Sequence, residues 1–281
     1  MSVHLQTRRI LKKSKLSFKP AFAGLNSVDI FAHEFPIEPF LAFTEYRMDR
    51  PVFGPHPHAG ISVMTYMLPD SRGSFINRDS LGDFSEIEPG GLHITQAGKG
   101  VQHDEFPKRS GTEAHGFQIW INHSHDHRLV EPQSMHARAD EIPVVHSDKY
   151  TVRVLQGSFH DHRALHQMVT PVTLLHIQLK NTHTIQLEGK EMAFVYTIKG
   201  YGESDRTKIS AHELVNYDNS TLPIQVIAED GDLEFMFATA TPINEPIVYG
   251  GPFVMTTPEQ MSDTKKRFGR GEMGTLEPYN N

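Results

Sequence analysis

The chain has 281 residues, of which 38% are hydrophobic and 22% charged; this composition can fill a core and excludes wholesale disorder. Its formal net charge of -7 excludes the basic surplus of nucleic-acid binders, so we expect no direct nucleic-acid partner. Cysteine is absent, which excludes disulfides and thiolate chemistry, so any metal must be held by nitrogen and oxygen ligands.

The length suits two ordinary domains. The chain has no run of about eighteen apolar residues and no apolar segment behind the basic residues near its start. We therefore expect no membrane span and no secretory signal, and we take the cytoplasm as the expected compartment.

Short alternating or apolar runs recur about every ten residues, separated by Gly, Pro, Asp and Asn, a pattern typical of all-β sandwiches and barrels. The clearest predicted strands span residues 61–68, 92–95, 117–121, 150–155, 173–179, 192–198 and 233–238. Helical periodicity is scarce. The sequence therefore predicts an all-β protein.

A polar, strand-poor stretch over residues 123–148 divides the chain near its middle. We place the boundary there, giving an N-terminal domain over 1–135 and a C-terminal domain over 136–281. Near the end, Thr257 suits a helix N-cap, Pro258 the first helical position and Gln260 the third position of a capping box. We expect Gly269 to end this short C-terminal helix.

Two pairs of residues in the N-terminal half have the spacing of metal ligands. His56 and His58 are two positions apart, as are His103 and Glu105, so each pair points to one face of an extended strand. On neighbouring antiparallel strands the four groups would converge on one point. Such a set would accept Fe(II), Mn(II), Ni(II), Cu(II) or Zn(II), and a six-coordinate ion would keep two positions open for catalysis. The bend at Gly98 and Gly100 would aim His103.

Several longer motifs surround these pairs. They are Gly54-Pro55-His56-Pro57-His58-Ala59-Gly60, Arg78-Asp79-Ser80-Leu81-Gly82, Ala97-Gly98-Lys99-Gly100-Val101-Gln102-His103-Asp104-Glu105-Phe106-Pro107, Phe117-Gln118-Ile119-Trp120-Ile121-Asn122 and Gly250-Gly251-Pro252-Phe253-Val254-Met255. In this order they resemble the pirin family, and the resemblance covers most of the chain from about residue 40 onward.

The resemblance implies a bicupin, with two cupin-type (double-stranded β-helix) barrels packed together and a short C-terminal helix. It implies one metal ion, expected as Fe(II), in the N-terminal barrel on His56, His58, His103 and Glu105. Quercetin 2,3-dioxygenase activity in the family implies a small aromatic substrate and O2. A flavonol would lose its 3-hydroxyl proton to Glu105, the expected catalytic base, before its ring opens with release of carbon monoxide.

Two other functions stay open. The family resemblance also implies a redox-sensitive regulatory role, in which the metal state alters binding of a protein partner without turnover. The cupin fold could equally carry a metal-dependent isomerase or hydrolase. A metal-free cupin that keeps the four residues for packing is a further alternative. We expect a monomer.

The chain departs from the family pattern around the expected pocket. Ala59 stands where the family usually has Arg, and Ser62 where it has Glu. Ile94 and Thr95 replace a bulky pair before the Ala-Gly motif. These departures affect the choice of substrate more than metal binding.

Rival clusters arise among the 18 histidines. We expect His123, His125 and His127 to lie in an exposed loop, and His160, His162 and His166 to have structural or surface roles. His176 and His183 are expected to be ordinary hydrogen-bonded histidines, leaving the second barrel free of metal. Trp120 is expected to lie in the core.

Overall fold

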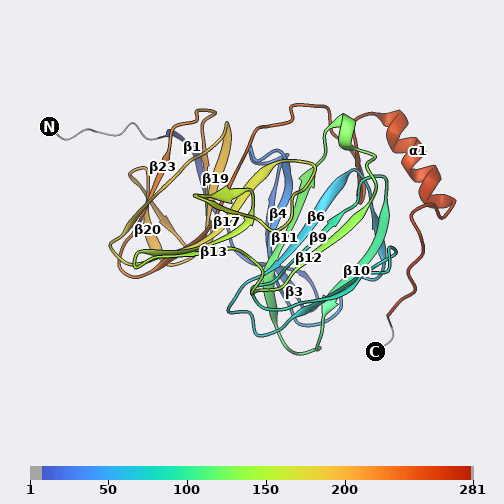
Figure 1. Ribbon diagram of the computed structural model, residues 1–281, viewed down its shortest axis with the longest axis horizontal. Coiled ribbons are helices and arrows are strands. Elements are labelled where there is room, and N and C mark those ends of the chain that lie inside the picture. Colours follow the sequence, from blue (N-terminus) through green and yellow to red (C-terminus); the bar gives the residue numbers. More distant parts are fainter. Residues whose placement is uncertain (1–7, 280–281) are drawn as a thin grey trace.

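The computed structural model describes residues 8–279 and consists of two β-barrels side by side with one α-helix (Figure 1). This confirms the predicted all-β, two-barrel cupin architecture. All seven strands predicted from apolar runs are present, shifted by one to three residues at their ends.

Two sheets form the N-terminal barrel. In spatial order the larger sheet contains β12 (Gln133–Ala137), β9 (Leu92–Gln96), β6 (Ile61–Met67), β11 (Ala114–Asn122), β4 (Phe40–Met48), β3 (Leu25–Phe31) and β2 (Lys19–Phe22). The smaller sheet contains β5 (His56–His58), β10 (Val101–Pro107), β7 (Phe75–Asp79) and β8 (Phe84–Ile87). Side chains alternate along each strand, so one set lines the barrel and the other packs outward.

The C-terminal barrel repeats this plan. Its larger sheet contains β1 (Ile10–Lys15), β22 (Glu213–Tyr217), β19 (Met192–Lys199), β24 (Leu233–Ala240), β17 (Val172–Leu179), β14 (Tyr150–Gln156) and β13 (Val144–His146). Its smaller sheet contains β18 (Thr184–Leu187), β23 (Ile224–Ala228), β20 (Tyr201–Ser204) and β21 (Thr207–Ser210). Two short strand pairs, one turn and one helix complete the fold. The pairs are β15 (Ser158–Phe159) with β16 (His162–Arg163) and β25 (Val248–Gly250) with β26 (Phe253–Met255); the turn is η1 (His125–His127) and the helix is α1 (Pro258–Gly269).

The chain ends cross between the barrels. The first described strand, β1, pairs with β22 in the C-terminal barrel, while β26 and α1 lie against the N-terminal barrel (Figure 1). Phe253 forms a bridge with Ala59 and shares an apolar cluster with Met261 and Met273. The division between residues 135 and 136 stays a prediction. The strand β1 and the segment of β26 and α1 each lie with the barrel formed by the other half of the chain.

The predicted strand-poor connection is wrong in part, because β12 and β13 lie within residues 123–148. Both are edge strands that add to the larger sheets. They have only five and three residues, so each offers too few alternating positions to be recognised as a strand. The predicted C-terminal helix is confirmed: Thr257 Oγ1 accepts a hydrogen bond from Gln260 N at 3.2 Å, and Gly269 is the last helical residue. Among residues 8–279, no helix is long and apolar enough to cross a bilayer.

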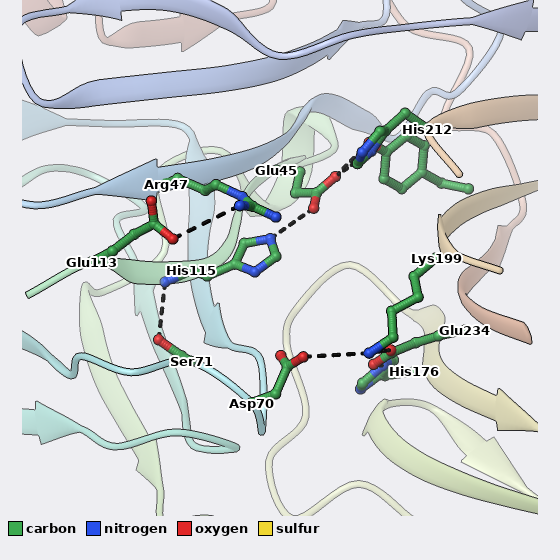
Figure 2. Close-up of polar contacts among 11 residues, drawn as sticks. Glu45, Arg47, Asp70, Ser71, Glu113, His115, His176, Lys199, His212 and Glu234 are labelled. Carbon is green, nitrogen blue, oxygen red and sulfur yellow. Dashed lines mark hydrogen bonds and ion pairs between the residues drawn. The ribbon is translucent and has the colours of Figure 1, made fainter. Parts of the chain in front are cut away.

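An apolar layer joins the two larger sheets, and polar groups are buried within it. Phe43 meets Phe194 edge-on, with ring centroids 5.1 Å apart. Beside them Glu45 accepts hydrogen bonds from His115 Nε2 at 2.7 Å and from the Tyr196 hydroxyl at 2.6 Å. Figure 2 shows this carboxylate between His115 of one barrel and His212 of the other.

Burial alone would raise the pKa of Glu45, but hydrogen bonds from His115, His212 and Tyr196 outweigh that effect and hold the pKa at about 2. The carboxylate is 1% exposed. Three donors from two barrels therefore converge on one anion, so ionised Glu45 holds the barrels together.

Candidate metal centre

Two short strands of the smaller N-terminal sheet bring the predicted histidines together. Strand β5 pairs antiparallel with β10, and His56 lies opposite His103 in the register. The bend before β10 is as tight as predicted, because Gly98 has φ of +49° and an added Cβ would lie 2.0 Å from the Val130 carbonyl oxygen. Lys99 N donates a hydrogen bond to the same Val130 oxygen at 2.8 Å, which holds the bend directly before β10 and His103.

The three imidazoles converge as the spacing predicts. Ring centroids of His56, His58 and His103 lie 4.7 to 5.0 Å apart, and the Nε2 atoms of His56 and His103 are 3.2 Å apart. One nitrogen from each ring falls within 4.8 Å of the others. Such a cluster of nitrogen atoms matches the spacing around one transition-metal ion.

Backbone carbonyls determine which nitrogen is free in two of the rings. His56 Nδ1 lies 2.8 Å from the Gly54 oxygen, and His58 Nδ1 lies 3.2 Å from the Pro252 oxygen. Because a carbonyl oxygen can only accept, each Nδ1 carries the proton and each Nε2 keeps a lone pair in the neutral ring. This is the usual outer support of a metal-ligating histidine.

The electrostatics also favour neutral rings. Burial, with a smaller effect from His56, lowers the pKa of His58 to about 3. Burial and the neighbouring His58 hold the pKa of His103 well below its usual value. Among residues 8–279, His103 Nδ1 is buried without a hydrogen-bond partner. Two buried imidazoles and the half-buried His56 imidazole, with their nitrogens facing one another, suit the binding of a divalent metal ion.

Glu105 lies near these histidines but outside the group of three. Its Oε2 accepts hydrogen bonds from Thr65 Oγ1 and Gln118 Nε2, both at 2.9 Å. Burial raises the pKa of Glu105 to about 7, against the lowering effect of these two bonds. The role of Glu105 as a fourth ligand and base therefore stays a prediction.

A cavity of about 990 Å³ opens onto His56, His58 and Glu105. Its wall is mainly apolar and aromatic, with Phe22, Leu25, Phe31, Leu41, Tyr46, Met48, Phe53, Phe75 and Tyr249 among the lining residues. Trp120 also lines it, with its ring centroid 5.0 Å from that of His58. The prediction that Trp120 belongs to the core is correct in part: its half-buried side chain packs against the apolar cluster of Leu41, Ile61, Val63 and Val254, and it also lines the cavity.

The structure shows the surroundings of two positions that depart from the expected family pattern. Ala59 is fully buried in the apolar cluster with Phe253. Ser62 Oγ lies 2.8 Å from Nε2 of His123, which is itself fully buried. The predicted exposed loop is therefore wrong for His123 and correct for His125 and His127, which are exposed.

The remaining histidine predictions agree with the structure. His160 and His162 are exposed, and His166 Nε2 donates to the His136 carbonyl oxygen at 2.8 Å. His176 is hydrogen-bonded on both sides, to the Tyr66 hydroxyl at 2.8 Å and to Glu234 at 2.9 Å. The absence of a metal from the second barrel stays a prediction.

Sequence reasoning missed the residues that support the site. Pro252 comes from the far end of the chain, and no local spacing connects it to His58. Thr65 and Gln118 occupy opposite positions on β6 and β11. Strand alternation alone would place both inward, but only the pairing of the strands shows that they meet at Glu105. A second group able to gather ligand atoms, Asp79, Asp83 and His93, was also missed.

Two family models match the sequence. The model described as "Pirin" matches residues 19–121, and "Pirin C-terminal cupin domain" matches residues 174–274. Pirin from Rattus norvegicus is 32% identical over 246 residues, which cover 85% of this chain and 83% of the relative. The chain belongs to the pirin family. Human Pirin is also 32% identical with the same coverage, and a Pirin-like protein of Solanum lycopersicum is 30% identical.

Solved structures share this pirin's fold. A quercetin 2,3-dioxygenase from Acinetobacter baumannii superposes with a TM-score of 0.86 over 97% of this chain and 100% of its own, at 22% identity. The bacterial pirin YhhW from Escherichia coli, in complex with nickel(II), gives a TM-score of 0.65 over 82% of this chain and 99% of its own, at 19% identity. At these identities the likeness establishes the fold.

Proposed function

We propose that this pirin is a metal-dependent dioxygenase that opens a flavonol-like aromatic ring with O2. The observation that carries the proposal is the convergence of His56, His58 and His103 at a large aromatic-lined cavity. We assign one ion, Fe(II), to these three residues with Glu105 as the fourth ligand. Mn, Ni, Cu or Zn would also suit this donor set.

When bound, Fe(II) would supply a Lewis acid for the enol oxygen of the substrate and a redox partner for dioxygen. The protein orients the histidine rings so that their nitrogens can bind this ion. The carbonyl oxygens of Gly54 and Pro252 fix the rings of His56 and His58. Burial lowers the pKa of His58 and of His103, which favours neutral rings at these two positions. No rearrangement of His56 or His58 tautomers is needed before an ion binds.

Glu105 is suited to take the substrate hydroxyl proton. Its pKa of about 7 lies near the working pH. At such a pKa a large fraction of the carboxyl group is ionised, and the ionised form still has a useful affinity for the substrate proton. Thr65 and Gln118 hold Oε2, which fixes the orientation of the carboxylate. We assign the proton transfer to Oε1, for which no hydrogen-bond partner is seen among residues 8–279.

The cavity suits a planar aromatic ligand. Its volume of about 990 Å³ lies at the upper end of small-molecule sites, and its wall is mainly apolar. Trp120 beside His58 offers a ring against which such a ligand can pack. The likeness to the Acinetobacter structure described as quercetin 2,3-dioxygenase supports a flavonol as the first substrate to test.

The test follows oxygen uptake with quercetin by protein of known metal content. We expect turnover by the Fe(II)-loaded wild type and a loss of at least about 100-fold for His103→Ala, since this change removes a ligand. His125→Ala is the matched control because His125 is exposed and outside the cluster. No oxygen uptake by fully loaded wild type would contradict the enzyme proposal and favour a regulatory protein whose metal state changes its partner binding.

A further inference from the structure

A second group of ligand-type side chains lies in the N-terminal barrel, apart from the three histidines. Asp79 ends β7, Asp83 follows in the turn, and His93 lies on β9. One ligand atom of each falls within 4.8 Å of the others. Asp79 lies opposite His103 in the pairing of β7 with β10, and His93 lies opposite Thr65 in the pairing of β9 with β6. The group therefore lines the same interior as the first site.

His93 is the most unusual member of this group. Its side chain is 1% exposed, and neither ring nitrogen has a hydrogen-bond partner among the described residues. Its Nδ1 lies 4.0 Å from Asp83 Oδ2. This separation is too long for a hydrogen bond, but two atoms bound to one ion at about 2.1 Å lie up to about 4.2 Å apart. The imidazole is thus placed to share an ion with Asp83.

The two carboxylates have no cationic partner of their own. Their side chains are 4% and 22% exposed, and within residues 8–279 neither Asp79 nor Asp83 pairs with a lysine or arginine. Nearby Arg78 pairs instead with Asp104 at 2.9 Å. Two carboxylates this close together, one of them almost fully buried, would be stabilised by a compensating positive charge.

Neutral groups orient both carboxylates, and the two oxygens that accept only one hydrogen bond, Asp79 Oδ2 and Asp83 Oδ1, keep a lone pair available. Asp79 Oδ1 accepts from the backbone nitrogens of Leu81 and Asp83 at 2.8 and 3.0 Å, and its Oδ2 accepts from Ser134. Asp83 Oδ2 accepts from Asn77 Nδ2 and from Ser85 Oγ, both at 2.9 Å, and Asp83 Oδ1 accepts from Ser85 Oγ at 2.8 Å. Within the described residues the Asn77 Oδ1 atom is buried without a partner, and it provides one more oxygen ligand beside Asp83. Oriented carboxylates with an amide oxygen nearby are typical surroundings of a bound cation.

We propose that Asp79, Asp83 and His93 form a second divalent-cation site, distinct from the site of the three histidines. One imidazole with two carboxylates is an oxygen-rich donor set, which favours Mn²⁺ among the first-row ions over the softer ions that suit three imidazoles. The ion would neutralise the two carboxylates and tie the hairpin of β7 and β8 to β9.

The test counts ions in the full chain. Metal-free protein is equilibrated by dialysis against Mn²⁺ alone, and the bound metal is measured by mass spectrometry. We expect two ions per chain in the wild type, one in His93→Gln and one in Asp83→Asn. His103→Ala should also keep one, and His125→Gln, an exposed histidine outside both groups, should keep two.

Anomalous diffraction from crystals of the Mn²⁺-loaded wild type tests the site without any substitution. An anomalous peak between Asp79, Asp83 and His93 is the expected result. The proposal is overturned if that position is empty, or if His93→Gln and Asp83→Asn fold and bind as many ions as the wild type. If the three histidines do not bind an ion, His103→Ala and the wild type will bind the same number of ions. This outcome differs from the one that overturns the second site, so the two proposals fail independently.

Discussion

The interiors of the two barrels differ although their strand plans match. In the C-terminal barrel, Phe235 and Phe237 of β24 point into a cluster of buried aliphatic and aromatic side chains. In the N-terminal barrel, His103 and Glu105 of β10 occupy inward positions beside a cavity of about 990 Å³. The same alternation along a strand thus fills the interior of one barrel and lines a cavity in the other. The residue types at inward positions decide which of these it is.

Both barrels bury polar atoms without partners, but these atoms differ in kind. Among residues 8–279, those of the N-terminal barrel include ring nitrogens of His93 and His103, and those of the C-terminal barrel include side-chain atoms of Gln156, Thr197 and Asn216. Such atoms cost roughly 1–3 kcal/mol each when they are left unpaired. The unpaired atoms of the N-terminal barrel thus include imidazole nitrogens, which are ligand-type atoms, whereas those named in the C-terminal barrel are amide and hydroxyl groups.

The largest effect should follow from opening a gap in the packed barrel. Phe235→Ala removes a fully buried ring, and we expect the free energy of unfolding to fall by about 3–5 kcal/mol. Urea denaturation measures this change. Iron content per folded chain should stay unchanged, because the packed cluster has no part in metal binding. A cost below about 1 kcal/mol would show that the second barrel is not closely packed.

Glu105→Gln tests the chemistry of the hollow barrel. The amide keeps the shape of the side chain but cannot take a proton, so we expect kcat for quercetin to fall by about 10²- to 10⁴-fold. Steady-state oxygen uptake at matched iron content measures it. Glu86→Gln, a change on β8 in a pair with Lys108, is the control. A kcat within threefold of the wild type would exclude Glu105 as the base.

Acid should weaken the junction between the barrels through Glu45. Its pKa of about 2 lies below the ordinary 4.5, so its ionised form favours the folded state. This contribution, about 3 kcal/mol, is complete above pH 4.5 and is lost as the pH falls toward 2. Unfolding measured between pH 6 and pH 2 should show a smaller loss for Glu45→Gln. Equal losses in the variant and the wild type would contradict the assignment.

The smallest effect concerns the cavity wall. Trp120→Ala should raise the Kd for quercetin by roughly three- to tenfold, since an aromatic contact contributes about 0.5–1.5 kcal/mol. Calorimetric titration measures it. Because Trp120 lines a cavity, its loss should destabilise the fold less than Phe235→Ala does. An equal loss of stability would place Trp120 in the core and remove the contrast between the barrels.

Local patterns predicted much of this molecule. Apolar runs located the central strands, and two spacings of i and i+2 identified His56, His58 and His103. Both signals lie within a few residues of sequence. The capped helix at Thr257 is equally local and was predicted for the same reason.

Contacts between distant segments were beyond such patterns. Three contacts depend on how segments that are remote in the sequence meet. They are the pairing of β1 with β22, the hydrogen bond between His58 and the Pro252 carbonyl oxygen, and the contact of buried His123 with Ser62. The group of Asp79, Asp83 and His93 joins a turn to another strand in the same way. A single sequence without a strand register does not specify these contacts.

Anomalous diffraction at the iron edge, from crystals grown with one equivalent of Fe(II), tests the central assignment most directly. We predict one peak about 2.0–2.2 Å from Nε2 of His56, His58 and His103, with a Glu105 carboxylate oxygen in its ligand shell. Iron bound at another position, with the three Nε2 atoms left without an ion, would contradict this assignment.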